Sequence, residues 1–277
     1  MKDKFFSLLK LALFATLSSQ LSSALAQGSL TPPGGPAPMM KSLDQVEPRT
    51  PITSLPIVIS QSGSYYLTRS FAQDFAVLDA ITIRADNVTV DLCGFTIQQT
   101  TNAVAVAGVR IGSTSINTPV RNAVVRNGTI TGFAAAGVTS QGGRNCLIEN
   151  LHVTGCNAGI SFQAFGTAGA AGNTIRRCRT TDNTVGSGVI FLSGAANIGN
   201  VIEDCESLNN STGFSLAGAG NLIVGCRASG NTGNNYTIAA GNRMGLIVLP
   251  GVNGGPINGA SGATGTGTSD PFANLSY

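Results

Sequence analysis

The stretch Asn200-Val-Ile-Glu-Asp-Cys205 recurs in varied form along most of the chain. Each copy opens with asparagine, carries one to three apolar residues in its next three positions, and closes with cysteine, asparagine or leucine. The copies begin at residues 87, 122, 145, 173, 200 and 221, so successive starts are 35, 23, 28, 27 and 21 residues apart. Self-similarity at a period of about 20–50 residues is the signature of a solenoid built from stacked coils.

A second mark follows in four of these repeats, where a glycine leads a short apolar alternation, as in Gly159-Ile-Ser-Phe162. This glycine stands 15, 14, 15 and 13 residues after the asparagine of its repeat. The nearly constant distance predicts fixed strands, because alternating apolar residues are typical of strands with one buried face. The variable lengths fall into edge loops, which we place near residues 100–118, 139–144, 163–172 and 193–199.

Stacking the repeats on their asparagines predicts which side chains share a column. Cys178, Cys205 and Cys226 fall in one inward column, where thiols fill space as small apolar residues do. Asn183, Asn210 and Asn231 form a second column, in which amide hydrogen bonds can run along the stack. The same alignment predicts two outward ion pairs and one histidine column: Arg177 with Asp204, Arg176 with Glu203, and His152 with Thr129, Thr180, Ser207 and Ala228.

The N-terminus indicates export. Lysines flank and interrupt an apolar stretch at residues 5–17, and Ala24-Leu25-Ala26 precedes Gln27. A basic start, a short apolar run and an A-x-A site are typical of a secretory signal peptide, so we expect cleavage after Ala26 and a periplasmic or secreted protein. This run is too interrupted for a membrane span, which takes ~20 apolar residues.

The domain organisation follows from these patterns. We expect a signal peptide at residues 1–26, a Pro/Gly-rich linker and N-terminal cap at 27–55, the solenoid at 56–250, and a Gly/Ser/Thr-rich tail at 251–277. The chain carries 16 basic and 13 acidic residues, and signal removal takes away three lysines and one aspartate. The remaining near-neutral chain gives no electrostatic case for nucleic acid as a partner.

The Asn-x-Ile-x-x-[Asn/Cys] step and the later Gly-Ile-x-Phe step resemble the right-handed parallel β-helix repeats of the pectin-lyase-like superfamily, which includes the periplasmic NosD-like proteins. The resemblance covers residues 56–250. It implies an all-β fold, a single-stranded right-handed parallel β-helix with an N-terminal cap. It specifies function poorly, because enzymes, adhesins and binding proteins share this fold.

The six cysteines are Cys93, Cys146, Cys156, Cys178, Cys205 and Cys226. An even count in an exported chain suggests disulfides, whereas the inward column favours buried free thiols. A bridge between adjacent coils stays open, since stacked strands lie ~4.8 Å apart. The chain has no C-x-x-C motif and a single histidine, so we expect no metal site and no cofactor.

Three residues are weak catalytic candidates: His152, Asp182 and Asp204. Glycoside hydrolysis generally needs two carboxyl groups at a defined separation, and these aspartates are near one another in the predicted stack. Each also has a structural interpretation, and the motifs that resemble polygalacturonases (Asn-Thr-Asp, Asp-Asp, Gly-His-Gly and Arg-Ile-Lys) are absent.

The function predicted from these observations is an exported, non-catalytic β-helix scaffold that presents a surface to a polysaccharide or another cell-surface component. A purely structural module remains open, as does a homo-oligomer such as a trimer. The alternative is a polysaccharide lyase or glycoside hydrolase of the same superfamily.

Overall fold

The structure is a computed structural model that describes residues 47–101, 106–112, 119–163, 169–191, 197–248, 257–259, 264–265 and 273–276. The chain divides into two units, Met1–Glu47 and Pro48–Tyr277, and all that follows concerns the second. The predicted signal peptide, most of the predicted linker and cap, and most of the predicted tail lie outside the described residues. In the described ranges every regular element is a strand, and no helix there has the length and apolarity to cross a membrane.

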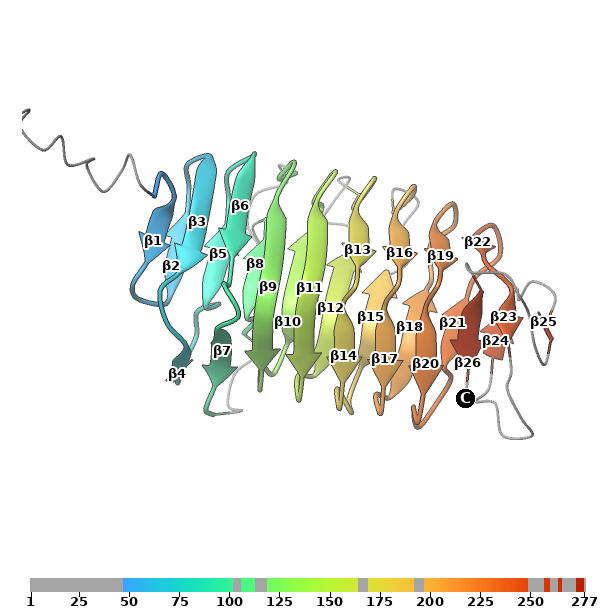
Figure 1. Cartoon of the computed structure of the whole chain (residues 1–277). Coiled ribbons are helices and arrows are strands. Elements are labelled where there is room, and N and C mark those ends of the chain that lie inside the picture. The colour runs from blue at the N-terminus through green and yellow to red at the C-terminus, as the bar shows by residue number, and fades with distance from the viewer. Residues whose placement is uncertain are drawn as a thin grey trace, which may run out of the picture. The chain divides into compact units, whose positions relative to one another are not determined.

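The second unit is a parallel solenoid whose strands form two sheets (Figure 1). One sheet has nine strands, one from each successive coil. In order these are β2 (Ile57–Ile59), β5 (Ile81–Ile83), β8 (Val109–Ile111), β10 (Ala136–Gln141), β12 (Ala158–Gln163), β15 (Ser187–Phe191), β18 (Thr212–Leu216), β21 (Tyr236–Ile238) and β24 (Ile257–Gly259).

The other sheet has seventeen strands, because most coils contribute two segments separated by a bend. Its strands are β1 (Thr50–Ile52), β3 (Gly63–Leu67), β4 (Phe71–Gln73), β6 (Val88–Asp91), β7 (Thr96–Gln99), β9 (Val124–Thr131), β11 (Leu147–Thr154), β13 (Thr174–Arg176), β14 (Arg179–Thr181), β16 (Val201–Glu203), β17 (Glu206–Leu208), β19 (Leu222–Val224), β20 (Arg227–Ser229), β22 (Arg243–Met244), β23 (Ile247–Val248), β25 (Thr264–Gly265) and β26 (Asn274–Ser276). The colours of Figure 1 run in chain order along the stack, so consecutive coils are spatial neighbours. The predicted all-β parallel β-helix is confirmed.

The register of the Gly-led strands is confirmed. Val138 pairs with Ile160, Ile160 with Val189, and Val189 with Phe214, and all four side chains are fully buried. Tyr236 extends the column, and its ring stacks on Phe214 with centroids 5.3 Å apart. These apolar columns fill the core between the two sheets.

The predicted register of the Asn-led strands is wrong by one residue between the third and fourth repeats. Leu147 pairs with Thr174, which places Cys146, rather than Asn145, level with Asn173. Asn145 instead lies at an exposed corner with φ 53°, level with Gly172 at φ 67°. Asparagine and glycine are the residues that most readily adopt this left-handed conformation, so one exchanges for the other between coils.

The repeated asparagine therefore marks two different positions. In the first three repeats it is the exposed corner residue, with φ between 53° and 56°. In the last three, Asn173, Asn200 and Asn221 are buried and hydrogen-bonded in a ladder that continues to Asn242. The corner passes to glycine in these coils, which shifts the asparagine one residue along the chain.

The two other predicted columns are confirmed. Cys178, Cys205 and Cys226 are buried one above another, since the strands on either side of them pair in register. Asn183 donates from its side-chain amide to Asn210 Oδ1 at 2.8 Å, and the Asn210 backbone N–H donates to Asn231 Oδ1 at 2.8 Å.

The predicted histidine column is also wrong, because the same shift of one residue in register changes the partners of His152. His152 pairs with Thr129 on one side and with Arg179, rather than Thr180, on the other. Its side chain is therefore on the outer face of the seventeen-stranded sheet, whereas Thr180 and Ser207 point into the core.

Candidate functional site

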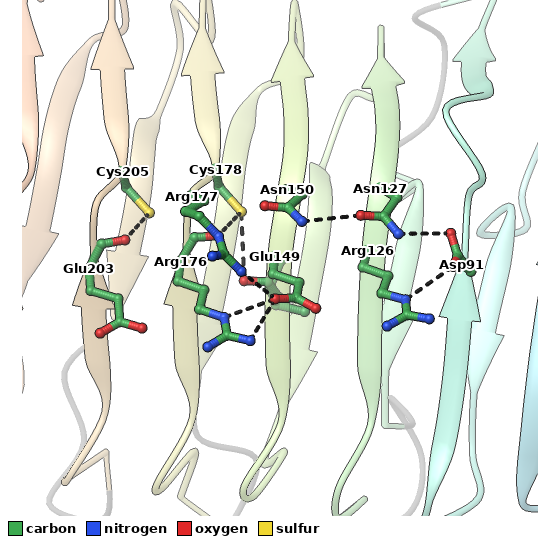
Figure 2. Close-up of polar contacts among 11 residues, drawn as sticks. Asp91, Arg126, Asn127, Glu149, Asn150, Arg176, Arg177, Cys178, Glu203 and Cys205 are labelled. Carbon is green, nitrogen blue, oxygen red and sulfur yellow. Dashed lines mark hydrogen bonds and ion pairs between the residues drawn. The ribbon is translucent and has the colours of Figure 1, made fainter.

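A line of polar side chains follows the bend of the seventeen-stranded sheet (Figure 2). In β9 and β11 the bend lies inside a continuous strand, and in later coils it separates the two segments. The residue at the bend is left-handed in four successive coils, at Asn127, Asn150, Arg177 and Asp204, with φ between 50° and 60°. Gly225 follows in the fifth, with φ 64°.

Asp91 begins this line. Its side chain is only 9% exposed, and Arg126 Nε contacts its Oδ2 at 3.1 Å. The Cys93 N–H and the Asn127 side-chain amide both donate to Oδ1, at 2.9 and 3.1 Å. Burial raises the pKa of Asp91, but these hydrogen bonds and the charge of Arg126 outweigh it and hold the pKa below its usual value. Asp91 is thus an ionised, fully engaged carboxylate.

Glu149 is held in the same way two coils further along. Its side chain is also 9% exposed, and its Oε2 accepts from Arg176 Nε at 2.9 Å and from Arg177 Nη2 at 3.2 Å. Figure 2 shows both guanidinium groups turned toward Glu149, while no dashed line reaches the side-chain carboxylate of Glu203 on the next coil.

The predicted ion pairs are therefore corrected. Arg176 is level with Glu203, and Arg177 with Asp204, as the alignment had placed them. Yet within the described residues neither Glu203 nor Asp204 forms an ion pair, because both arginines turn to Glu149 on the opposite side. A pair with the buried Glu149 is less screened by water than one with an exposed carboxylate, which favours this choice.

A shallow groove of about 470 Å³ lies beside the bend in the following coils. Arg179 Nε contacts Glu206 Oε2 across it at 3.3 Å. Arg227 is level with Glu206 on its other side and has no ion pair among the described residues. The side chains at its surface are Arg177, Arg179, Asp204, Glu206 and Arg227, with Cys178 and Cys205 beneath.

Among the described residues no hydrogen bond or ion pair joins any two of the three catalytic candidates. His152 Nε2 is 3.1 Å from Thr181 Oγ1, and the neighbouring Asp182 acts on its charge. Burial and the charge of Arg179 lower the pKa of His152, against a smaller opposite effect of Asp182. Asp204 lies in the groove instead, at the bend.

The two aspartates occupy left-handed corners, Asp182 at φ 57° and Asp204 at φ 51°. Their columns contain Asn209 and Gly230 in one case, Asn150 and Gly225 in the other. Because Asp182 lies five residues beyond the position level with Asp204, strand geometry separates the two by roughly 15 Å. Backbone conformation accounts for aspartate at both positions, and their catalytic role stays a prediction.

All six cysteines are free, and all but Cys93 are buried. Burial raises the pKa of the Cys146 and Cys156 thiols to about 11 and that of Cys178 and Cys205 well above its usual value. Such thiols remain protonated and unreactive at neutral pH. Within the described ranges no three His, Cys, Asp or Glu side chains lie close enough together to hold a metal ion.

Sequence reasoning missed the ion pair of Asp91 with Arg126 and those of Glu149 with Arg176 and Arg177. The signal was present, because asparagine or glycine at the corner of every coil fixes the register once the two are treated as equivalent. With that rule Arg126, Glu149, Arg176 and Glu203 fall into one row, as they do in the structure.

Comparison with known proteins agrees with this geometry. The family model described as a right-handed β-helix region matches residues 107–249, just over half of the chain. The chain belongs to the right-handed β-helix family. No curated protein matches this β-helix.

Two solved structures are similar to the β-helix. One is ORF18 of Geobacillus virus E2, with a TM-score of 0.55 and 14% identity over 72% of this chain and 43% of that one. The other is XylC in complex with xylose, with a TM-score of 0.44 and 14% identity over 66% of this chain and 38% of that one. The β-helix thus spans well under half the length of either, and the likeness to the viral protein shows the fold alone.

Proposed function

We propose that this chain is an exported, non-catalytic β-helix scaffold that presents the groove beside the bend of the seventeen-stranded sheet (the bend groove) to a glycan or another cell-surface component. The observation that carries the proposal is the groove of about 470 Å³, in which three arginines and two carboxylates line an extended, shallow surface. A surface of this kind offers many directed donors and acceptors to a hydroxyl-rich chain. The backbone beneath it is fixed by strand pairing on both sides, which keeps the donors in place.

The distribution of carboxylates supports a binding role over a catalytic one. Asp91 and Glu149 are engaged by arginines, and Glu206 is paired with Arg179. Asp182 and Asp204 are separated by roughly 15 Å, whereas glycosidase carboxyl pairs are about 5–9.5 Å apart.

The alternative of a lyase or hydrolase rests on Asp204, a carboxylate in the arginine-lined groove that forms no ion pair in the described part of the chain. A single experiment separates the two. The mature protein is applied to a glycan array, and the glycans that bind are then incubated with it and examined for reducing ends and unsaturated products.

We expect binding without turnover. The double substitution of Arg179→Ala and Arg227→Ala should reduce binding at least tenfold, and Arg243→Ala, an exposed arginine on the same sheet outside this groove, should leave it unchanged. Turnover abolished by Asp204→Asn or Asp182→Asn would establish the enzyme instead. Binding unaffected by the double substitution would remove the groove from the proposal.

Export is part of the same proposal. Production of the full chain in a bacterium should release a mature protein with Gln27 at its N-terminus, identified by intact mass. An uncleaved, intracellular product would contradict it.

A further inference from the structure

The outer face of the nine-stranded sheet carries a second recess, at the end of the stack where β2, β5 and β8 lie. Its volume is about 360 Å³. Val58, Thr82 and Arg110 are level with one another on three neighbouring coils and form its floor, and the turn at residues 77–79 forms one wall. We call it the apolar groove and define it by Val58, Val77, Leu78, Thr82, Arg84 and Val106.

Apolar side chains gather here in an unusually exposed state. Val58 is 52%, Val77 73% and Leu78 56% exposed. Only two other large apolar side chains in the described part are comparably exposed, Val185 and Ile198, and neither lines this groove. Exposed apolar side chains that cluster mark interaction surfaces, whereas isolated ones need no explanation.

The turn that presents Val77 and Leu78 is held rigidly before these residues. Phe75 is buried against Phe133, with ring centroids 5.6 Å apart, and its N–H donates to the buried Gln99 Oε1 at 2.8 Å. Ala76 is left-handed at φ 51°, and its N–H donates to Asp74 Oδ1 at 2.8 Å.

The turn is held after these residues as well. Asp79 forms a two-point ion pair with Arg110 and accepts from the Ala107 N–H at 2.7 Å. The Leu78 N–H closes the turn on the Phe75 carbonyl at 3.0 Å. Val77 and Leu78 are thus displayed by a braced turn, and a preorganised surface loses little entropy on binding.

The charge of the groove narrows the choice of partner. Asp79 neutralises Arg110 at the floor, whereas Arg84 is exposed and forms no ion pair among the described residues. The groove therefore combines apolar walls with one uncompensated positive charge. Its complement is an aliphatic side chain next to a carboxylate.

We propose that the apolar groove docks a short extended segment of a partner protein in which an aliphatic residue is adjacent to Asp or Glu. A groove of about 360 Å³ has room for a few side chains, which fits a short segment, and the charge of Arg84 selects an acidic residue within it. The proposal is independent of glycan binding, because the bend groove is on the other sheet and shares no residue with this one.

A phage-displayed library of random heptapeptides, selected on the full chain, tests it. We expect enrichment of peptides that place Leu, Ile or Val beside Asp or Glu. A synthetic peptide of the enriched sequence should bind at least tenfold more weakly to the Val77→Ser, Leu78→Ser double variant. The matched control is Val185→Ser, which replaces a valine that is also 73% exposed and should bind as the parent does.

Arg84→Gln should abolish the preference for an acidic residue while retaining the aliphatic one. Circular dichroism of each variant should match the parent, since all these side chains are exposed. The proposal is overturned if no peptide is enriched, if enriched peptides bind the double variant equally well, or if they carry no acidic residue. A dimer in light scattering that the double variant loses would identify a second copy as the occupant and would overturn it too.

Discussion

Replacement of Asn200 by alanine should destabilise the solenoid more than any exposed substitution. Asn200 is fully buried in the ladder. Its Oδ1 accepts from the Asn173 N–H at 3.0 Å and from Asn173 Nδ2 at 2.9 Å. Its Nδ2 donates to the Ala170 carbonyl and to Asn221 Oδ1, both at 2.9 Å.

Alanine at this position removes all four side-chain hydrogen bonds. Each buried group left without a partner costs ~1–3 kcal/mol. The lower value fits best, because water can enter part of the space that the amide vacates. Asn221 Oδ1 keeps the hydrogen bond that the Asn200 backbone N–H donates to it at 3.1 Å, so three groups lose their partner. The expected loss is therefore about 3 kcal/mol, a large fraction of the ~5–15 kcal/mol that stabilises a typical domain.

Urea unfolding followed by circular dichroism measures this loss. The matched control is Asn234→Ala, since Asn234 is half-buried and its side chain makes a single 3.3 Å hydrogen bond. The control should lose less than ~1 kcal/mol. An Asn200→Ala loss near that of the control, with an unchanged dependence on urea, would refute the view that the ladder holds the coils together.

Three further predictions concern the outer face and the thiols. Glu149→Ala should cost about 1–2 kcal/mol, which is below the ~3–5 kcal/mol of a fully buried pair because its arginines are 37% and 54% exposed. Glu203→Ala, two coils further along the same row at a carboxylate with no ion pair among the described residues, should cost less than ~0.5 kcal/mol. Equal losses would contradict the ion pairs of Glu149 with Arg176 and Arg177. A thiol reagent should modify Cys93 alone in the native protein and the other five cysteines only in urea, so two or more reactive native thiols would place another cysteine at the surface. Burial lowers the pKa of His152, so the unfolded chain binds more protons near pH 6, and stability should rise as pH increases toward and past the unfolded value of 6.5. His152→Gln removes the sole histidine and should flatten this rise, measured as the melting temperature between pH 5 and 7.5. An unaltered rise in the variant would assign the pH dependence to other groups.

The fold was predictable because two independent marks repeat in each coil. The Gly-led strands aligned correctly, since the distance between apolar residues in a strand is fixed by its two-residue period. The Asn-led strands slipped by one residue, since asparagine serves both as a left-handed corner, as at Asn145, and as a buried ladder residue, as at Asn173. Sequence periodicity alone does not distinguish these two uses.

The candidate site was less predictable than the fold. The row of charged residues was evident from the sequence. Which neighbouring carboxylate each arginine pairs with depends on how deeply that carboxylate is buried, and the sequence does not show this. Glu149 and Glu203 occupy the same position of their repeats and are both level with Arg176, yet among the described residues only Glu149 forms an ion pair with it. The apolar groove combines residues from β2, β5, β8 and the turns before them, so no local motif announces it. The predicted edge loop at 139–144 is corrected, because β10 continues to Gln141, and the predicted loop at 100–118 contains β8. About half of each of the predicted loops at 100–118, 163–172 and 193–199 lies outside the described residues.

The buried asparagine ladder has a consequence for how such a chain can change length during evolution. Every inner rung both accepts a hydrogen bond from the coil before it and donates one to the coil after it, as Asn200 does between Asn173 and Asn221. A duplicated coil, such as a second copy of residues 200–220, would add one hydrogen-bond acceptor and one donor to the ladder. Every amide in the ladder would then still have a partner on each side. Tandem duplication in this half of the gene should therefore be tolerated, whereas the insertion of a coil with an apolar residue at the rung would remove one hydrogen bond from the amide on each side.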